Sequence, residues 1–86
     1  MKIDIQLFGA FRDHDPAARV QLDVPDDARV ADVRAALDAY GRAHWPRFQP
    51  ALLQRSALAS DSAVLRDHEA VPGGRRMAVL PPVSGG

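Results

Sequence analysis

The chain has 86 residues, the size of one small domain, and its 11 basic residues equal its 11 acidic ones. Balanced charge gives no long-range attraction to nucleic acid or anionic lipid, and no apolar run approaches the roughly 20 residues of a membrane span. We therefore expect no nucleic-acid partner and no membrane association. Because Asp4 would interrupt the apolar stretch of a secretion signal, we expect a cytoplasmic protein.

Two stretches near the N-terminus, residues 2–8 and 19–24, alternate between apolar and polar side chains. This period of two is typical of half-buried strands. The stretch 13–16 between them, Asp-His-Asp-Pro, is rich in turn formers and predicts that the two strands form a hairpin. Phe8 falls on the polar face of the first strand. The apolar positions are Ile3, Ile5, Leu7, Val20, Leu22 and Val24.

From Val30 onward the apolar period changes to three and four residues, which predicts a helix. Pro46 disfavours helical geometry at Trp45, so we expect the helix to end at or before Trp45. We expect His44 to be partly buried, and Trp45 and Phe48 to cover the small core. The stripe consists of Val30, Val33, Leu37, Tyr40 and His44.

The remaining pattern is that of short elements. Residues 47–54 are irregular or a short helical turn, 56–59 and 63–65 are short strands around a turn at 60–62, and 76–80 is a final strand after a turn at 72–74. A hairpin, one main helix over one face and further strands make an α+β fold of two layers. The crossover through the helix allows the last strand to lie parallel to the first in the middle of a mixed sheet. We therefore predict a ubiquitin-like β-grasp domain over residues 1–80, followed by an extended tail, 81–86.

The tail, Pro-Pro-Val-Ser-Gly-Gly, carries the most information about function. Pro81 and Pro82 restrict the backbone, so we expect the tail to be stiff and extended, with a reach of roughly 20 Å for six residues. Gly85 and Gly86 have no side chains, so they fit a narrow channel and leave the Gly86 carboxylate sterically open to react with ATP. A frayed end is the alternative, but a frayed end needs no rigid spacer.

Cysteine is absent, which excludes disulfides, thiolate metal sites and cysteine nucleophiles. Lys2 is the only lysine, so lysine chemistry has a single candidate. We expect no metal site at Asp13-His14-Asp15, because three adjacent loop residues rarely converge on one ion. We find no residue in the chain that we expect to be catalytic.

Residues 77–86, Met-Ala-Val-Leu-Pro-Pro-Val-Ser-Gly-Gly, resemble the end of the small subunit of molybdopterin synthase, a family that typically ends in an apolar strand and Pro-Pro-Val-(Ser/Thr)-Gly-Gly. The stretch 3–13 and the helix pattern at 30–37 resemble the same family. The resemblance implies a sulfur carrier with no bound cofactor. A ubiquitin-activating-like adenylyltransferase would use ATP to adenylate Gly86, and a sulfur donor would convert the adenylate to a thiocarboxylate.

The resemblance further implies that the tail enters the large subunit, within a heterotetramer of two small and two large subunits. There it would donate sulfur to cyclic pyranopterin monophosphate in molybdenum cofactor biosynthesis. An apolar cluster on the sheet face away from the helix, Phe8, Val64 and Leu80, is the candidate interface with that partner. The inserted tail residues would be Pro81, Pro82, Val83, Ser84 and Gly85.

One departure from the family pattern concerns charge. The turn before the last strand is often acidic in the family, whereas this chain has Arg75-Arg76, which leaves the details of partner contact open. The alternatives are a related sulfur carrier for thiamine, tungsten cofactor or amino-acid synthesis, and a ubiquitin-like modifier joined to lysines. A plain interaction module with an inert tail is a further alternative, and it would tolerate deletion of Gly85-Gly86.

Overall fold

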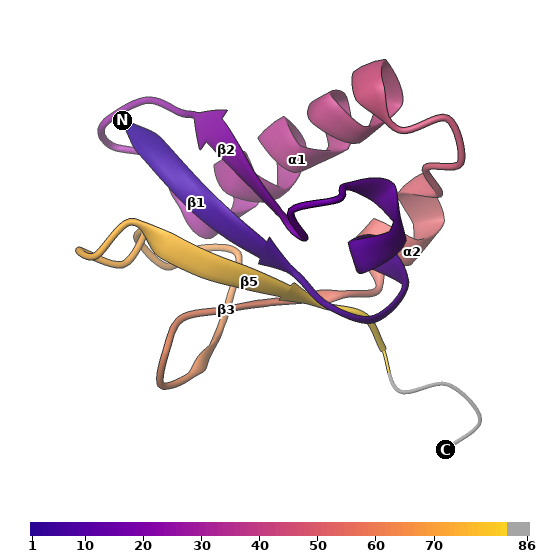
Figure 1. Cartoon of the computed structure of the whole chain (residues 1–86). Coiled ribbons are helices and arrows are strands. Elements are labelled where there is room, and N and C mark those ends of the chain that lie inside the picture. The colour runs from indigo at the N-terminus through magenta and orange to yellow at the C-terminus, as the bar shows by residue number, and fades with distance from the viewer. Residues whose placement is uncertain (83–86) are drawn as a thin grey trace.

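A computed structural model describes residues 1–82, and the predicted tail residues Val83, Ser84, Gly85 and Gly86 lie outside the described residues. Figure 1 shows a twisted sheet with one long helix across it. The strand predicted at 76–80 and the end of the main helix before Trp45 are both confirmed. The elements are β1 (Lys2–Leu7), the 3-10 helix η1 (Gly9–His14), β2 (Arg19–Asp23), α1 (Val30–His44), α2 (Pro50–Gln54), β3 (Ala57–Ala59), β4 (Val64–Leu65) and β5 (Arg76–Leu80).

The sheet has the strand order β2-β1-β5-β3-β4. β1 pairs with β2 antiparallel and with β5 parallel, so β5 lies in the middle of the sheet beside β1, as predicted. In the parallel pair Ile5 lies opposite Met77 and Leu7 lies opposite Val79. α1 covers one face of the sheet and leaves the other face open (Figure 1). This mixed sheet with one main helix is the ubiquitin-like β-grasp fold.

The core lies between α1 and the sheet. The apolar positions predicted to face inward on both N-terminal strands are buried, and Val30, Val33 and Leu37 of α1 have no exposed surface. Trp45 is buried at the end of α1 and Phe48 packs against it, so both cover the core as expected. The prediction for His44 was wrong. His44 is exposed, because the chain turns at Trp45 and the indole, instead of the imidazole, closes this end of the core.

The connection between β1 and β2 also differs from the prediction. The strands form the expected hairpin, but the predicted turn at 13–16 is shifted, since η1 includes Asp13 and His14. Phe11 is buried in the core and holds this part of the connection against it. The turn itself follows, with the Ala18 N–H donating to the Asp15 carbonyl oxygen over 3.0 Å. The aromatic residue inside a polar stretch therefore converts a tight turn into a folded segment.

Polar contacts fix the first half of α1. At its start the Asp32 carboxylate accepts a hydrogen bond of 2.8 Å from the Arg29 backbone N–H. Arg34, which is 13% exposed, donates to the carbonyl oxygens of Leu53 and Ser56 over 2.8 Å each and so ties α1 to the segment leading into β3. Within residues 1–82, no helix combines the length and the apolar character required to cross a membrane.

Candidate docking face and tail exit

The tail leaves from the centre of the sheet. β5 is flanked by β1 and β3, and it ends at Leu80, directly before Pro81 and Pro82. All three of these residues are half-buried. Figure 1 shows the chain emerging beyond β5, at the end of the sheet where η1 and α2 also lie. A segment attached here is anchored by two neighbouring strands, and its starting point is fixed by the fold.

The open face of the sheet carries the three residues predicted as a partner interface. Phe8 is 41% exposed and continues the extended backbone of β1 (φ −121°, ψ 160°), so its side chain points away from the buried Leu7. Val64 is 65% exposed on β4, and Leu80 is half-buried on β5. Continuing the parallel register by one residue brings Phe8 beside Leu80, whereas Val64 lies at the far edge of the sheet.

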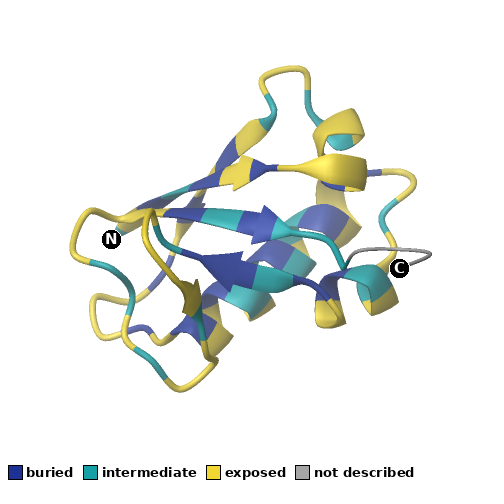
Figure 2. Cartoon of the chain, turned by 90° about the horizontal axis from the view of Figure 1, so that it is seen from below, coloured by how far each residue is buried: buried dark blue, intermediate teal, exposed yellow. Residues whose placement is uncertain are grey.

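Alanines connect these residues across the open face. Ala59 pairs with Ala78 of β5 and with Val64 of β4, and Ala57 pairs with Leu80. Figure 2, which views the molecule from this side, shows the central strands coloured as buried and intermediate residues. These alanines were not predicted as part of the interface, although the alternation around the buried Leu58 could have placed Ala57 and Ala59 on the open face. We call the set the open-face patch: Phe8, Ala57, Ala59, Val64, Ala78 and Leu80. It is an apolar surface beside the tail exit, to which the buried Ala59 contributes almost no exposed area.

A row of charges lies beyond the patch, toward the start of β5. Arg19 pairs with Asp4 at 3.4 Å, and Arg76 of β5 lies 3.8 Å from Asp61 in the β3–β4 turn. These pairs are exposed or half-exposed, so they contribute little to stability. Arg75, next to this row, has a left-handed backbone with φ 57°. Arg76 is the first residue of β5, four residue steps or about 13 Å from Leu80. Arg75 precedes it, so the reversed charge lies away from the tail exit.

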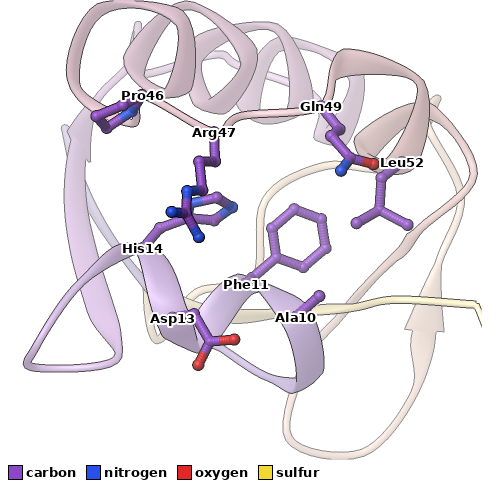
Figure 3. Close-up of a pocket in the computed structure, with 8 residues that line it drawn as sticks. All are labelled: Ala10, Phe11, Asp13, His14, Pro46, Arg47, Gln49 and Leu52. Carbon is purple, nitrogen blue, oxygen red and sulfur yellow. The ribbon is translucent and has the colours of Figure 1, made fainter.

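A second feature at the tail-exit end is a hollow of about 390 Å³ between η1 and the α1–α2 connection (Figure 3). Its lining includes Phe11, Asp13, His14 and Arg47. His14 stacks on Trp45 with ring centroids 4.6 Å apart and an angle of 7° between the planes, which is a packing contact. No three His, Asp or Glu side chains within residues 1–82 are grouped to hold a metal ion.

Comparison with known proteins defines the class. The model of the ThiS family matches residues 5–86, and the chain belongs to the ThiS family. This is a family of ubiquitin-like sulfur carriers and modifiers, and its sulfur carriers typically work with an activating enzyme and a catalytic partner subunit. No curated protein matches the chain.

Solved structures give more particular likenesses. The chain is similar to SAMP1 from Haloferax volcanii, with 28% identity over 100% of both chains and a TM-score of 0.74. It is also similar to a second structure described as small archaeal modifier protein 1 from H. volcanii, with 25% identity, coverage of 95% and 98%, and a TM-score of 0.69. The solution structure of the H. volcanii HVO 2177 protein is 25% identical over 100% of this chain and 87% of that one, with a TM-score of 0.70.

Proposed function

We propose that this ThiS-family chain is the small, sulfur-carrying subunit of molybdopterin synthase. The observation that carries the proposal is the sequence Pro-Pro-Val-Ser-Gly-Gly, which directly follows a central strand and lies within a family match extending to Gly86. A carrier needs a rigid body that partners recognise and a narrow terminus that they can handle. The β-grasp body and the two terminal glycines supply these two parts.

The chemistry is carried by the Gly86 carboxylate. One of its oxygens attacks the α-phosphorus of ATP held by the activating enzyme, and pyrophosphate leaves. A sulfur donor then displaces AMP from the acyl adenylate and leaves a thiocarboxylate. Because the chain has no cysteine, this terminus is its only route to a transferable sulfur. The large subunit supplies the acid–base groups that deliver the sulfur to cyclic pyranopterin monophosphate.

The large subunit binds at the open-face patch. Apolar surface beside the tail exit allows a partner to bind the body and receive the tail in one arrangement. Phe8 and Leu80 are the central contacts, because they lie together next to Pro81, and Val64 contacts the partner at the rim. The residues Pro81, Pro82, Val83, Ser84 and Gly85 then lead Gly86 into the partner's active site.

Intact-mass measurement tests the proposal. The chain is incubated with ATP, the activating enzyme and a sulfur donor, and we expect a mass increase that corresponds to one oxygen exchanged for sulfur. The sulfurated chain mixed with the large subunit should then convert cyclic pyranopterin monophosphate. A chain lacking Gly86 is the control and should give neither result. Sulfuration without precursor conversion would indicate a carrier for thiamine, tungsten cofactor or amino-acid synthesis.

A ubiquitin-like modifier is the second candidate. It is favoured by the similarity to structures described as small archaeal modifier protein 1, at 25–28% identity over nearly the whole chain. In this case Gly86 would appear in isopeptide bonds with lysines of cellular targets. Lys2, which is exposed, is the only lysine side chain through which copies of this chain could be linked to one another. Peptide mapping of material purified from cells separates the two functions, with Lys2→Arg as the control for self-linkage.

A further inference from the structure

Gly9 combines two constraints that are independent of each other. Its φ is +56°, a region that residues with a Cβ rarely occupy. In addition, a Cβ built on Gly9 would lie 2.5 Å from Cγ of Pro81 and 3.4 Å from its Cδ. The first constraint lets the chain turn from β1 into η1, and the second lets the Pro81 ring lie directly against the backbone. We call Gly9 and Pro81 the tail seat.

The Gly9 side of the tail seat is held by the core. Phe11, two residues further on, is 1% exposed, and its backbone N–H donates to the Phe8 carbonyl oxygen over 3.1 Å. On the other side of Gly9, the Leu7 N–H donates to the Ala18 carbonyl oxygen over 2.8 Å. The chain on both sides of Gly9 is therefore held by hydrogen bonds and by the buried Phe11, and Pro81 packs against this supported segment.

The tail seat is also aligned with the docking surface. Leu7 pairs with Val79 in the parallel register, so the next steps bring Phe8 beside Leu80 and Gly9 beside Pro81. The ring of Pro81 fixes its φ, and the following proline restricts its ψ. A contact that holds this ring therefore sets the direction in which the backbone continues, relative to the open-face patch.

We propose that Gly9 is a positioning residue that aims the C-terminal tail relative to the open-face patch. The inference rests on the proposed function, in which an activating enzyme binds the body and reacts with Gly86. If the tail seat is intact, the terminus reaches the reactive centre as soon as the body docks. If the tail seat is lost, the body still docks, but the terminus samples many directions before it reaches the reactive centre.

The test uses the full-length chain and measures kcat and KM for ATP-dependent adenylation by the activating enzyme. The variants are Gly9→Ala, Pro81→Ala and the double variant, with Gly74→Ala as the matched control because a Cβ there meets nothing within 4 Å. For Gly9→Ala we expect kcat to fall about ten- to a hundredfold, the scale of a misplaced reacting group, with KM within about twofold. Gly74→Ala should leave both constants unchanged.

The double variant separates a role through Pro81 from simple destabilisation. If Gly9 acts through the proline ring, the double variant is about as slow as the slower single variant, since both changes remove one contact. Effects that multiply, or a kcat of Gly9→Ala equal to that of the unaltered chain, would overturn the proposal. If Gly9→Ala fails to fold, Pro81→Gly removes the ring from the other side. An unchanged kcat in that variant would equally overturn it.

A readout independent of activity keeps this inference distinct from the proposed function. In the unaltered chain we expect a nuclear Overhauser effect between the Gly9 α-protons and the Pro81 ring, and its absence contradicts the tail seat whatever the enzyme does. Failure of the unaltered chain to become adenylated contradicts the proposed function, even where the Overhauser effect is present.

Discussion

The two faces of the sheet use apolar residues for different purposes. The face under α1 carries large side chains with almost no exposed surface, such as Ile5 and Val79. The open face carries alanines between two exposed large residues, Phe8 and Val64. On the covered face, large side chains pack closely against α1 and stabilise the fold. On the open face, small side chains leave Phe8 and Val64 exposed. In the proposed function, stability and recognition are therefore separated on opposite sides of one layer, and substitutions can test that separation.

Leu37→Ala should have the largest effect. Leu37 has no exposed surface at the centre of α1, and truncating it leaves a cavity that costs about 2–5 kcal/mol of unfolding free energy. Val64→Ala on the open face is the matched comparison and should change stability by less than about 0.5 kcal/mol. Urea denaturation followed by Trp45 fluorescence measures both. Equal costs would contradict the division between the two faces.

Arg34→Met should come next. Met keeps the apolar stem of Arg34 but leaves the carbonyl oxygens of Leu53 and Ser56 without its hydrogen bonds, at a cost of about 1–3 kcal/mol. Arg42→Met, which removes an exposed pair with Asp38, is the control and should cost less than about 1 kcal/mol. Thermal unfolding gives the comparison, and a neutral Arg34→Met would show that water replaces the lost donors.

Phe8→Asp should leave the fold intact and weaken binding. A carboxylate in the open-face patch has to lose water when a partner covers it, so we expect binding to the proposed partner, the large subunit of molybdopterin synthase, to weaken at least about tenfold, or about 1.4 kcal/mol. Titration calorimetry with the large subunit measures the affinity, and circular dichroism checks the fold. Lys2→Asp, on the same strand but far from the tail exit, is the control. Unchanged affinity of Phe8→Asp would remove the open-face patch as the docking surface.

Gly41→Ala should have the smallest effect, and it should lower the free energy of unfolding, whereas a glycine-to-alanine change in a helix usually raises it. Alanine normally stabilises a helix by about 1 kcal/mol relative to glycine. Here a Cβ would lie 2.6 Å from Cδ1 of Phe48, so the ring must move and we expect a net loss of about 1 kcal/mol. Gly73→Ala is the control, because a Cβ there meets nothing within 4 Å. A gain in stability would mean that Phe48 yields freely.

The elements could be predicted from the sequence where one local rule decided the structure. Pro46 determines the end of α1, and alternation around Met77 and Val79 gives β5 and its buried face. The predictions were wrong where a single side chain outweighed a local pattern. Phe11 does so in a stretch of turn formers, and Trp45 takes the buried position expected for His44 at the end of the helical stripe. Burial of one aromatic ring outweighs several weak turn preferences, and the sequence does not indicate which ring is buried.

The candidate site divides in the same way. The tail motif and Phe8 are visible in the sequence because the motif is distinctive and the phenylalanine breaks a polar face. The alanines of the open-face patch are not distinctive, because alanine is often fully buried and does not by itself indicate an open surface. The contact between Gly9 and Pro81 joins the two ends of the domain and depends on the register of a parallel strand pair. Only the three-dimensional arrangement reveals it.

The parallel pairing of β1 and β5 has a mechanical consequence. Tension between the beginning of β1 and the end of β5 runs along both strands, so it loads their connecting hydrogen bonds in shear and all at once, from Asp4–Arg76 to Leu7–Val79. A hairpin pulled from its open end would instead unzip one bond after another. An enzyme that pulls the C-terminus into its active site therefore loads the sheet along its strands, the direction in which these hydrogen bonds share the force.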